Sequence, residues 1–212
     1  ALMLISRVGD EYYAVMASSL VKPVTDRLRM YVLRSKVKVE VLDQMAVAGI
    51  EGGIIANAEE LATVIPIPGT TDRSLLLMDT KTIDPGSDEV VNAWKVGELE
   101  RGITWLSPET SGQFLPQWLG FDELGAVNFR KGCYPGQEIV ARTKYLGKVK
   151  RRPRLLDIEN DLCPEAMDKL KLSSGEQSDN AVLVDRVHAE SGSLLFVVTR
   201  LDPDARVEQV EF

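Results

Sequence analysis

Lys131–Glu138 (KGCYPGQE) has the composition of a tight turn, with glycines on both sides of its cysteine. Pro135 fixes φ for the second position of a type II turn, and Gly136 supplies the positive φ that the third position requires. Gln137–Tyr145 follows the turn and is predicted to form a helix. The sequence therefore predicts that Cys133 lies on a tight loop just before a helix N-terminus.

Cys133 is the candidate catalytic residue of this loop, together with Lys131. Arg130 and Lys131 lie beside it, and both positive charge and a helix N-terminus favour the thiolate over the thiol. A base is therefore not required, and His188 is expected in a different domain. The alternative is that Cys133 is a small buried apolar residue, as free cysteines often are. Cys163 has no such surroundings and is interpreted as incidental.

The composition limits the class of protein. The 212 residues are 44% hydrophobic, which is enough for one large domain or two small ones. No run of about 18 apolar residues occurs, so neither a membrane-spanning helix nor a membrane partner is expected. Ala1–Val8 lacks the basic start of a signal peptide and is predicted to be a strand. Two cysteines and one histidine are too few for a metal site of about four ligands, so we expect no metal and a reducing, cytoplasmic location.

Positive charge is concentrated in Phe129–Arg154, although the net charge of the whole chain is −7. This segment, the basic band, has nine basic residues and one acidic residue, Glu138, and therefore a net charge of +8, which leaves −15 for the rest of the chain. A basic band on an acidic protein can bind or steer an anionic partner, and the alternative is a solvated surface without a ligand. The basic residues are Arg130, Lys131, Arg142, Lys144, Lys148, Lys150, Arg151, Arg152 and Arg154.

Two domains are predicted, 1–150 and 151–212, with the boundary at Arg152-Pro153. The first is expected to begin with a hairpin around Gly9-Asp10. Its further elements are a helix from about 19–23 to 34, strands at 36–42, 45–50 and 73–78, and helices at 56–64 and 89–102. The second is expected to contain strands at 154–158, 169–172, 181–188, 194–200 and 206–210, which is typical of a small antiparallel barrel or sandwich.

Three stretches together resemble a known family. They are Ser111–Gln117 (SGQFLPQ), Leu124–Phe129 (LGAVNF) and Lys131–Arg142 (KGCYPGQEIVAR). They are similar to the signature of the folate-binding YgfZ family, which is related to the aminomethyltransferase (T-protein) of the glycine cleavage system. The resemblance is strong over residues 94–152, extends less clearly to 28–41 and is weak elsewhere, and its cysteine octapeptide is specific.

The resemblance implies an α+β fold with T-protein-like folate-binding lobes around a central channel, followed by a small C-terminal antiparallel β-barrel. It implies binding of tetrahydrofolate or a derivative, and a role in iron–sulfur cluster assembly or repair and in tRNA modification. The implied partners are folate, iron–sulfur client proteins and tRNA-modifying enzymes, in the bacterial cytoplasm. The family's opening segment is absent from this sequence, so the N-terminal part of the folate-binding region is expected to be missing.

A folate site needs an aromatic or apolar slot for the pterin ring, with carboxylates or amides at its edge. The predicted cofactor-binding residues are Glu100, Trp105, Gln117, Tyr134, Gln137 and Glu138, and the basic band would suit the anionic glutamate tail. The alternatives are ordinary core packing for the tryptophan and a solvated helix face for Glu100.

Three functions are therefore in view. The first is a folate-binding accessory protein for iron–sulfur proteins and tRNA modification, in which Cys133 acts as a thiolate. The second is an aminomethyltransferase-type folate enzyme. The third is a module that binds RNA or an acidic partner without folate chemistry. A net charge of −7 argues against generic nucleic-acid binding, so direct binding of nucleic acid is not expected.

Overall fold

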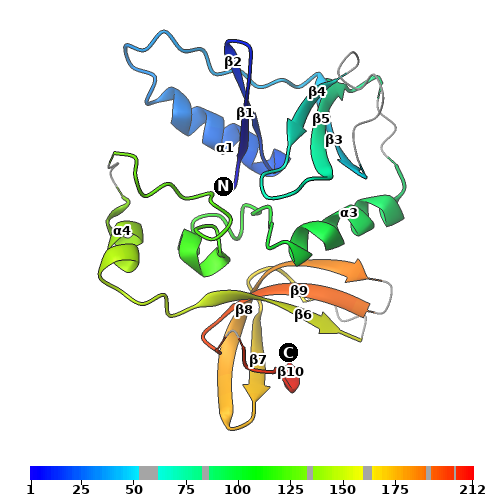
Figure 1. The fold of residues 1–212 in the computed structure, drawn as a ribbon, viewed down its shortest axis with the longest axis vertical. Helices are drawn as coiled ribbons and strands as arrows, with labels where there is room; N and C mark the ends of the chain where they lie inside the picture. Colours follow the sequence, from blue (N-terminus) through cyan, green and yellow to red (C-terminus); the bar gives the residue numbers. More distant parts are fainter. Residues whose placement is uncertain (53–61, 83–85, 133–135, 160–163, 190–191, 203) are drawn as a thin grey trace. The chain divides into compact units, whose positions relative to one another are not determined.

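The computed structural model describes residues 1–52, 62–82, 86–132, 136–159, 164–189, 192–202 and 204–212. The chain forms two compact units, Ala1–Ser87 and Asp88–Phe212. Both units contain helices and sheets, as Figure 1 shows, and all strand pairs of the described residues are antiparallel. The predicted α+β class is therefore confirmed.

The first unit begins with the predicted hairpin. β1 (Leu4–Val8) pairs with β2 (Glu11–Val15) across Gly9-Asp10, and Gly9 has φ +62°, a turn conformation that glycine adopts without steric cost. The helix α1 (Ser18–Arg29) follows and ends before the predicted end at residue 34. Pro23 lies inside α1, where its missing N–H removes one helix hydrogen bond.

The half-buried strand predicted at Lys36–Leu42 (KVKVEVL) is wrong. These residues form no strand, and the side chains of Val37 and Val41 are 59% and 39% exposed. Alternation of polar and apolar residues favours a strand only where a neighbouring strand accepts its backbone hydrogen bonds. Here the guanidinium of Arg29 donates instead to the carbonyl oxygen of Val39, at 3.1 Å from Nε and 2.9 Å from Nη2.

A three-stranded sheet makes up the rest of the first unit. Its order is β3 (Met45–Glu51), β5 (Arg73–Asp79) and β4 (Thr63–Pro66), which confirms the strands predicted at 45–50 and 73–78. The central strand β5 buries Leu75–Leu77. The predicted helix at 56–64 is wrong at its end, because Thr63 and Val64 already pair with β5; residues 53–61 lie outside the described part.

The second unit consists of helices followed by a five-stranded sheet. The helices are α3 (Asp88–Glu100), the 3₁₀-helix η1 (Pro116–Leu119) and α4 (Glu138–Tyr145). The strands are β6 (Arg152–Ile158), β7 (Lys169–Ser174), β8 (Gln177–Ala189), β9 (Gly192–Thr199) and β10 (Gln209–Glu211), in the sheet order β10-β7-β8-β9-β6. All five strands expected after residue 150 are present, and the last is shorter than predicted.

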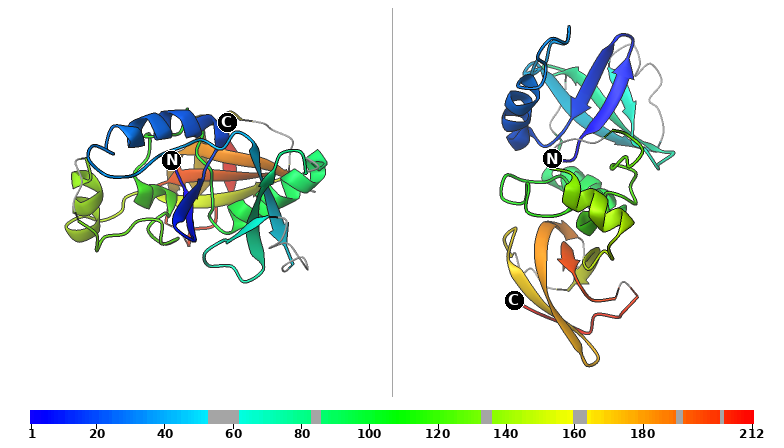
Figure 2. Two further views of the ribbon diagram at one scale, coloured as in Figure 1. Left: turned by 90° about the horizontal axis from the view of Figure 1, so that it is seen from above. Right: turned by 90° about the vertical axis from the view of Figure 1, so that its left-hand side faces the viewer.

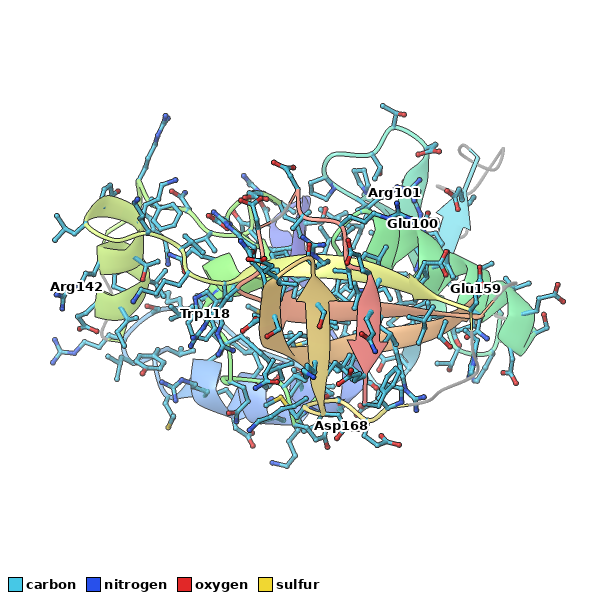
Figure 3. All side chains as sticks on the ribbon, turned by 90° about the horizontal axis from the view of Figure 1, so that it is seen from below. Glu100, Arg101, Trp118, Arg142, Glu159 and Asp168 are labelled. Atoms are coloured by element: carbon cyan, nitrogen blue, oxygen red, sulfur yellow. The ribbon has the colours of Figure 1, made fainter. Side chains whose placement is uncertain are left out.

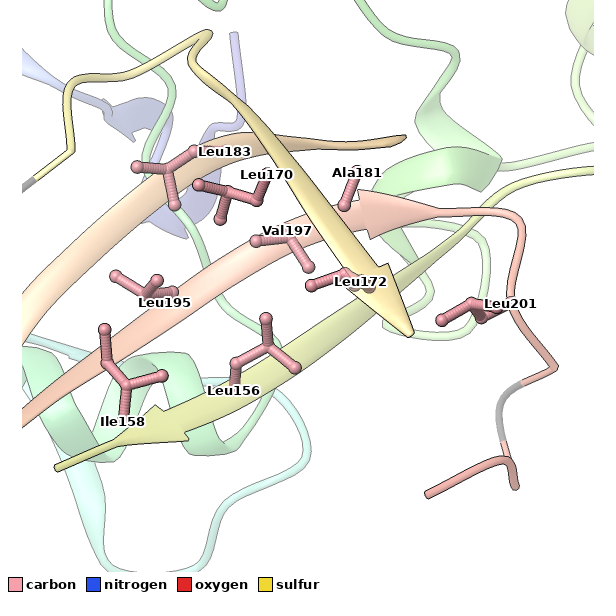
Figure 4. Packing of buried hydrophobic residues seen from close by; sticks show 9 residues of the cluster. All are labelled: Leu156, Ile158, Leu170, Leu172, Ala181, Leu183, Leu195, Val197 and Leu201. Carbon is pink, nitrogen blue, oxygen red and sulfur yellow. The ribbon is translucent and has the colours of Figure 1, made fainter. Parts of the chain in front are cut away.

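The sheet of the second unit is curled, as Figure 2 shows, and Figure 4 shows the apolar side chains that pack inside it. It does not close into the predicted barrel, because the edge strands β6 and β10 do not pair with each other in the described residues. Instead Arg154 of β6 donates to the backbone carbonyl oxygens of Asp202 and Ala205, which precede β10. The core residues are Leu156, Ile158, Leu170, Leu172, Ala181, Leu183, Leu195, Val197 and Leu201.

A β-bulge attaches α3 and the following loop to this sheet. The register of β8 and β9 shifts between Leu183 and Asp185, and such a shift re-aims the side chain that follows it. Asp185 accepts from the ammonium of Lys95 at 2.6 Å and from the hydroxyl of Thr104 at 3.2 Å. The sheet thereby positions the C-terminal end of α3.

Only the C-terminal half of α3 is buried. Helical spacing predicts that Val90, Val91 and Leu99 face inward. Leu99 is 2% exposed, but Val90 and Val91 are 63% and 54% exposed. Their predicted inward orientation is wrong, because the buried residues of α3 are Gly97, Glu98 and Leu99 at the end that packs near β8. Helical spacing predicts which residues share a face, whereas the neighbouring strand determines how far along the helix that face is covered.

The boundary expected at Arg152-Pro153 lies inside the second unit. Arg152 donates to the carboxylate of Asp122 at 3.2 Å, and a Cβ on Gly120 would lie 3.1 Å from the ring of Pro153. The start of β6 therefore packs against the residues that follow η1. The division into 1–150 and 151–212 stays a prediction.

Candidate functional site

The cysteine segment is anchored on its N-terminal side by an asparagine. Asn128 Oδ1 accepts hydrogen bonds from the backbone N–H groups of Arg130 at 2.8 Å and of Lys131 at 3.2 Å. An Asx turn of this kind sets the direction of the chain just before the cysteine. Cys133 and Tyr134 lie outside the described residues, so their predicted roles as catalytic and cofactor-binding residues stay predictions.

On the C-terminal side of the segment, Gly136 has the positive φ that the sequence predicts. Gly136 has φ +94°, as the third position of a type II turn requires. Its backbone N–H donates to Glu138 Oε1 at 3.4 Å, and Glu138 is the first residue of α4, where a carboxylate interacts favourably with the helix dipole. Gln137, the residue before α4, makes no side-chain cap hydrogen bond. The helix predicted at 137–145 is thus confirmed as α4.

Phe129 attaches the chain before the cysteine to the C-terminal end of α4. Its carbonyl oxygen accepts from the hydroxyl of Tyr145 at 3.3 Å, and the two rings meet edge to face with centroids 6.3 Å apart. The ammonium of Lys144 lies 5.1 Å from the centre of the Phe129 ring, a distance that permits a cation–π interaction. The two flanks of residues 133–135 are therefore tied to one short helix.

Gln117 connects this helix to the rest of the unit. Its side chain is fully buried, and its Nε2 donates to the carbonyl oxygen of Val140 on α4 at 2.7 Å. Its own backbone carbonyl accepts from Arg152 at 3.2 Å. The side-chain oxygen of Gln117 is buried without a hydrogen-bond partner. The structure therefore places this predicted cofactor-binding residue between η1, α4 and β6, where it supports the position of α4.

A buried carboxylate that the sequence analysis missed lies near the end of α3. Glu98 is 4% exposed, and its Oε1 accepts from the indole N–H of Trp105 at 2.9 Å. The half-buried Trp105 ring is thereby fixed in orientation, whereas Glu100 is exposed on the same helix. The only sequence signal for Glu98 is its place next to the apolar Leu99 in a predicted helix. Such a place does not distinguish a buried carboxylate from a solvated one.

The loop between α3 and η1 is ordered by its own hydroxyl groups. The buried Thr110 accepts from the backbone N–H of Ser107 at 2.9 Å. A hydrogen bond from the side chain of Ser107 also lowers the pKa of Glu109, since it stabilises the ionised carboxylate. These bonds shape the segment that leads from Trp105 to Gln117.

Besides Lys144, which lies against the Phe129 ring, three arginines of the basic band have structural contacts. The guanidinium of Arg151 lies 5.3 Å from the centre of the Trp118 ring. Arg152 pairs with Asp122 at 3.2 Å and with Glu123 at 3.0 Å, and Arg154 binds the two backbone carbonyls described above. Not all nine cations of the basic band are therefore equally available to an anion, and anion binding by the band stays a prediction. The exposed members are Arg130, Lys131, Arg142, Lys144, Lys148 and Lys150.

Sequence comparison places this architecture among known proteins. No family model matches the chain. The chain is similar to the tRNA-modifying protein YgfZ of Escherichia coli O127:H6, with 28% identity over 228 residues that cover 94% of this chain and 70% of that protein. The tRNA-modifying protein YgfZ of Shigella boydii serotype 4 matches with the same identity and coverage. The chain belongs to the YgfZ family. The match extends over both units, well beyond the octapeptide that first indicated it.

In this member of the YgfZ family, the predicted site residues fall into two groups. Gln117 is hydrogen-bonded to α4, the helix that begins with Glu138 after Gln137. Glu100 and Trp105 belong to the end of α3 and the loop after it. Figure 3 shows Glu100 and Arg142 far apart, with Trp118 between them. Because Arg142 belongs to α4, the two groups lie on different parts of the second unit, and their joint role in folate binding stays a prediction.

Two further properties of this YgfZ-family chain follow from the described residues. Within them, no helix is both long and apolar enough to span a membrane. No group of three or more histidine, cysteine, aspartate or glutamate side chains in the same ranges has a geometry suited to a metal ion.

Proposed function

We propose that this chain is a folate-binding accessory protein that supports tRNA modification through iron–sulfur proteins, with Cys133 as its reactive thiolate. The observation on which the proposal depends is the anchoring of the cysteine segment within a chain of the YgfZ family. Asn128 fixes the backbone on one side of residues 133–135, and the Gly136–Glu138 turn fixes it on the other. Two relatives are named tRNA-modifying proteins, which supports the same role here.

The chain's own residues favour a thiolate at this position. Lys131 and Arg130 are exposed, and their backbone N–H groups are bound by Asn128. The two cations precede Cys133 by two and three residues. Positive charge stabilises a thiolate without a histidine base, so the proposed role of Lys131 is electrostatic. In this role Cys133 would serve as the chain's own nucleophile or as a transient ligand for a cluster iron of a client protein.

Some of the described residues have the chemistry that binding of tetrahydrofolate requires. Trp105 presents a half-buried ring whose orientation is fixed by the Glu98 carboxylate, which suits stacking on a pterin. Glu100 offers an exposed carboxylate nearby in the chain, which suits the hydrogen-bond donors at the pterin edge. Gln117 is sealed from solvent and fits a supporting role better than a ligand role. When bound, tetrahydrofolate would supply a carrier for one-carbon units. We propose with it that the two units are lobes of a T-protein-like folate-binding fold.

Calorimetric titration with tetrahydrofolate tests the cofactor. Trp105→Leu removes the ring and Glu100→Gln removes the carboxylate charge, so both variants should weaken binding by about tenfold or more, equivalent to about 1.4 kcal/mol. Glu89→Gln is the matched control, because Glu89 is an exposed carboxylate at the other end of the same helix. Equal affinity in all four proteins would remove α3 and Trp105 from the folate site.

A complementation assay tests the thiol. In an Escherichia coli strain lacking its own YgfZ protein, the chain should restore tRNA modification, measured by mass spectrometry of digested tRNA. Cys133→Ser should fail and Cys163→Ser should succeed. Because serine is nearly isosteric with cysteine but has no low pKa, normal rescue by Cys133→Ser would remove the thiolate from the mechanism.

A further inference from the structure

Five exposed cations around α4 form no ion pair with the acidic side chains that the structure describes. They are Arg130, Arg142, Lys144, Lys148 and Lys150, which together we name the α4 cationic surface. None of the five is in an ion pair with a described residue. Elsewhere, exposed cations do find partners: Lys22 pairs with Asp26 at 2.5 Å and Lys171 pairs with Glu211 at 2.8 Å.

The five cations lie on one short stretch of the molecule. Phe129 binds Tyr145 and Lys144, so the neighbouring Arg130 lies close to the C-terminal end of α4. Lys150 follows Tyr145 by five residues and is therefore at most about 18 Å from it along the chain. Figure 3 shows Arg142 on the outer side of α4. The surface thus presents several like charges over a distance of a few phosphate groups.

The local charge balance favours a polyanion as the ligand of this surface. The only acidic residue between 130 and 150 is Glu138, and it lies at the N-terminus of α4. The rest of the chain is acidic, so a polyanion is repelled elsewhere and attracted here. The net charge of −7 therefore argues against generic nucleic-acid binding without excluding one oriented contact.

We propose that the α4 cationic surface binds the phosphate backbone of tRNA, an inference that rests on the proposed role in tRNA modification. Three of its five cations are lysines, which bind phosphates but are depleted at protein–protein interfaces. Tyr145 is 66% exposed and offers a ring face to an unstacked base. The contact positions the RNA and does not read its sequence.

Binding of an unmodified tRNA transcript, measured by fluorescence anisotropy from about 50 to about 200 mM salt, tests the proposal. Five phosphate contacts predict a loss of affinity of a few hundred-fold across this range. The fourfold variant Arg142→Gln, Lys144→Gln, Lys148→Gln and Lys150→Gln should lose most of that salt dependence. The matched control neutralises one arginine and three lysines that are exposed and ion-paired, namely Arg7, Lys22, Lys38 and Lys171. It should bind like the wild type.

Three outcomes would overturn the proposal. They are the absence of binding at low salt, equal losses in the two fourfold variants, and binding of poly-L-glutamate in place of tRNA, which would assign the surface to an acidic protein. Tryptophan fluorescence in urea confirms that the variants are folded. Tetrahydrofolate titration and rescue by Cys163→Ser are measured in parallel. If tRNA binding fails while these succeed, only the surface assignment fails; if these fail as well, the proposed function fails.

Discussion

Gln117 offers a sharp test of how the structure supports α4. The side chain makes one hydrogen bond, from Nε2 to the carbonyl oxygen of Val140 at 2.7 Å, and buries a side-chain oxygen that has no partner. Substitution by leucine removes both features with little change in volume. Substitution by glutamate keeps the shape but replaces the donor by a second oxygen. The two variants therefore separate polarity from packing at one position.

The expected free energies follow from these contacts. Gln117→Leu loses a hydrogen bond of about 1 kcal/mol and relieves a buried unpaired acceptor that costs about 1–3 kcal/mol. The free energy of unfolding of the second unit should therefore either fall by less than about 1 kcal/mol or rise. Gln117→Glu places a carboxylate opposite the Val140 carbonyl in a fully buried position, and an unpaired buried charge costs about 3–5 kcal/mol near neutral pH.

The stability of the Gln117→Glu variant is also expected to depend on pH. Burial raises the pKa of the new carboxyl above its unfolded value of about 4.3. The neutral acid can donate to Val140, so the destabilisation should be small below about pH 4 and should grow as the pH rises through the folded pKa. Urea unfolding followed by tryptophan fluorescence measures this, because Trp94, Trp105 and Trp118 all lie in the second unit. A leucine variant as unstable as the glutamate variant would refute the reasoning.

Two smaller predictions concern backbone strain and pH. Gly192→Ala should destabilise the second unit by about 2–4 kcal/mol, because Gly192 has φ +150° and its new Cβ would lie 2.0 Å from the carbonyl oxygen of Ile158. The control Gly175→Ala, at φ +56° with open space around the new Cβ, should cost only about 1 kcal/mol. Equal losses of stability in urea unfolding would contradict the clash. The hydrogen bond from Ser107 lowers the pKa of Glu109, so the wild type should be more stable to unfolding than Glu109→Gln above about pH 4.3. This difference in stability should disappear as the pH falls through the folded pKa of Glu109. A difference in stability that persists at about pH 2–3 would show that the charge of Glu109 is not its cause.

Local signals in the sequence predicted much of the fold correctly. Gly9-Asp10 between β-branched and aromatic runs predicted the first hairpin, and Pro135-Gly136 predicted a turn that the structure confirms at Gly136. The strand runs after residue 150 were placed correctly because alternating apolar residues face one core. The strand predicted at Lys36–Leu42 from the same pattern is wrong, because alternation indicates a strand only when a partner strand is present.

The sequence predicted which residues belong to the candidate site better than it predicted their contacts. The sequence identified Gln117 and Trp105, but not that Gln117 binds Val140 or that Trp105 is held by the buried Glu98. It also counted nine basic residues without separating those that are exposed from those, such as Arg152, that are engaged in structural contacts. Hydrogen-bond partners and burial depend on residues distant in the chain.

By itself the sequence determined the kinship of the chain, the turn at Gly9-Asp10 and the positive φ at Gly136, because these depend on short-range backbone preferences and on residues close together in the chain. Only the tertiary structure decided that the curled sheet stays open, that Gln117 supports α4, and which cations remain free to meet an anion. These features result from contacts between segments far apart in the sequence, whose geometry no local pattern specifies.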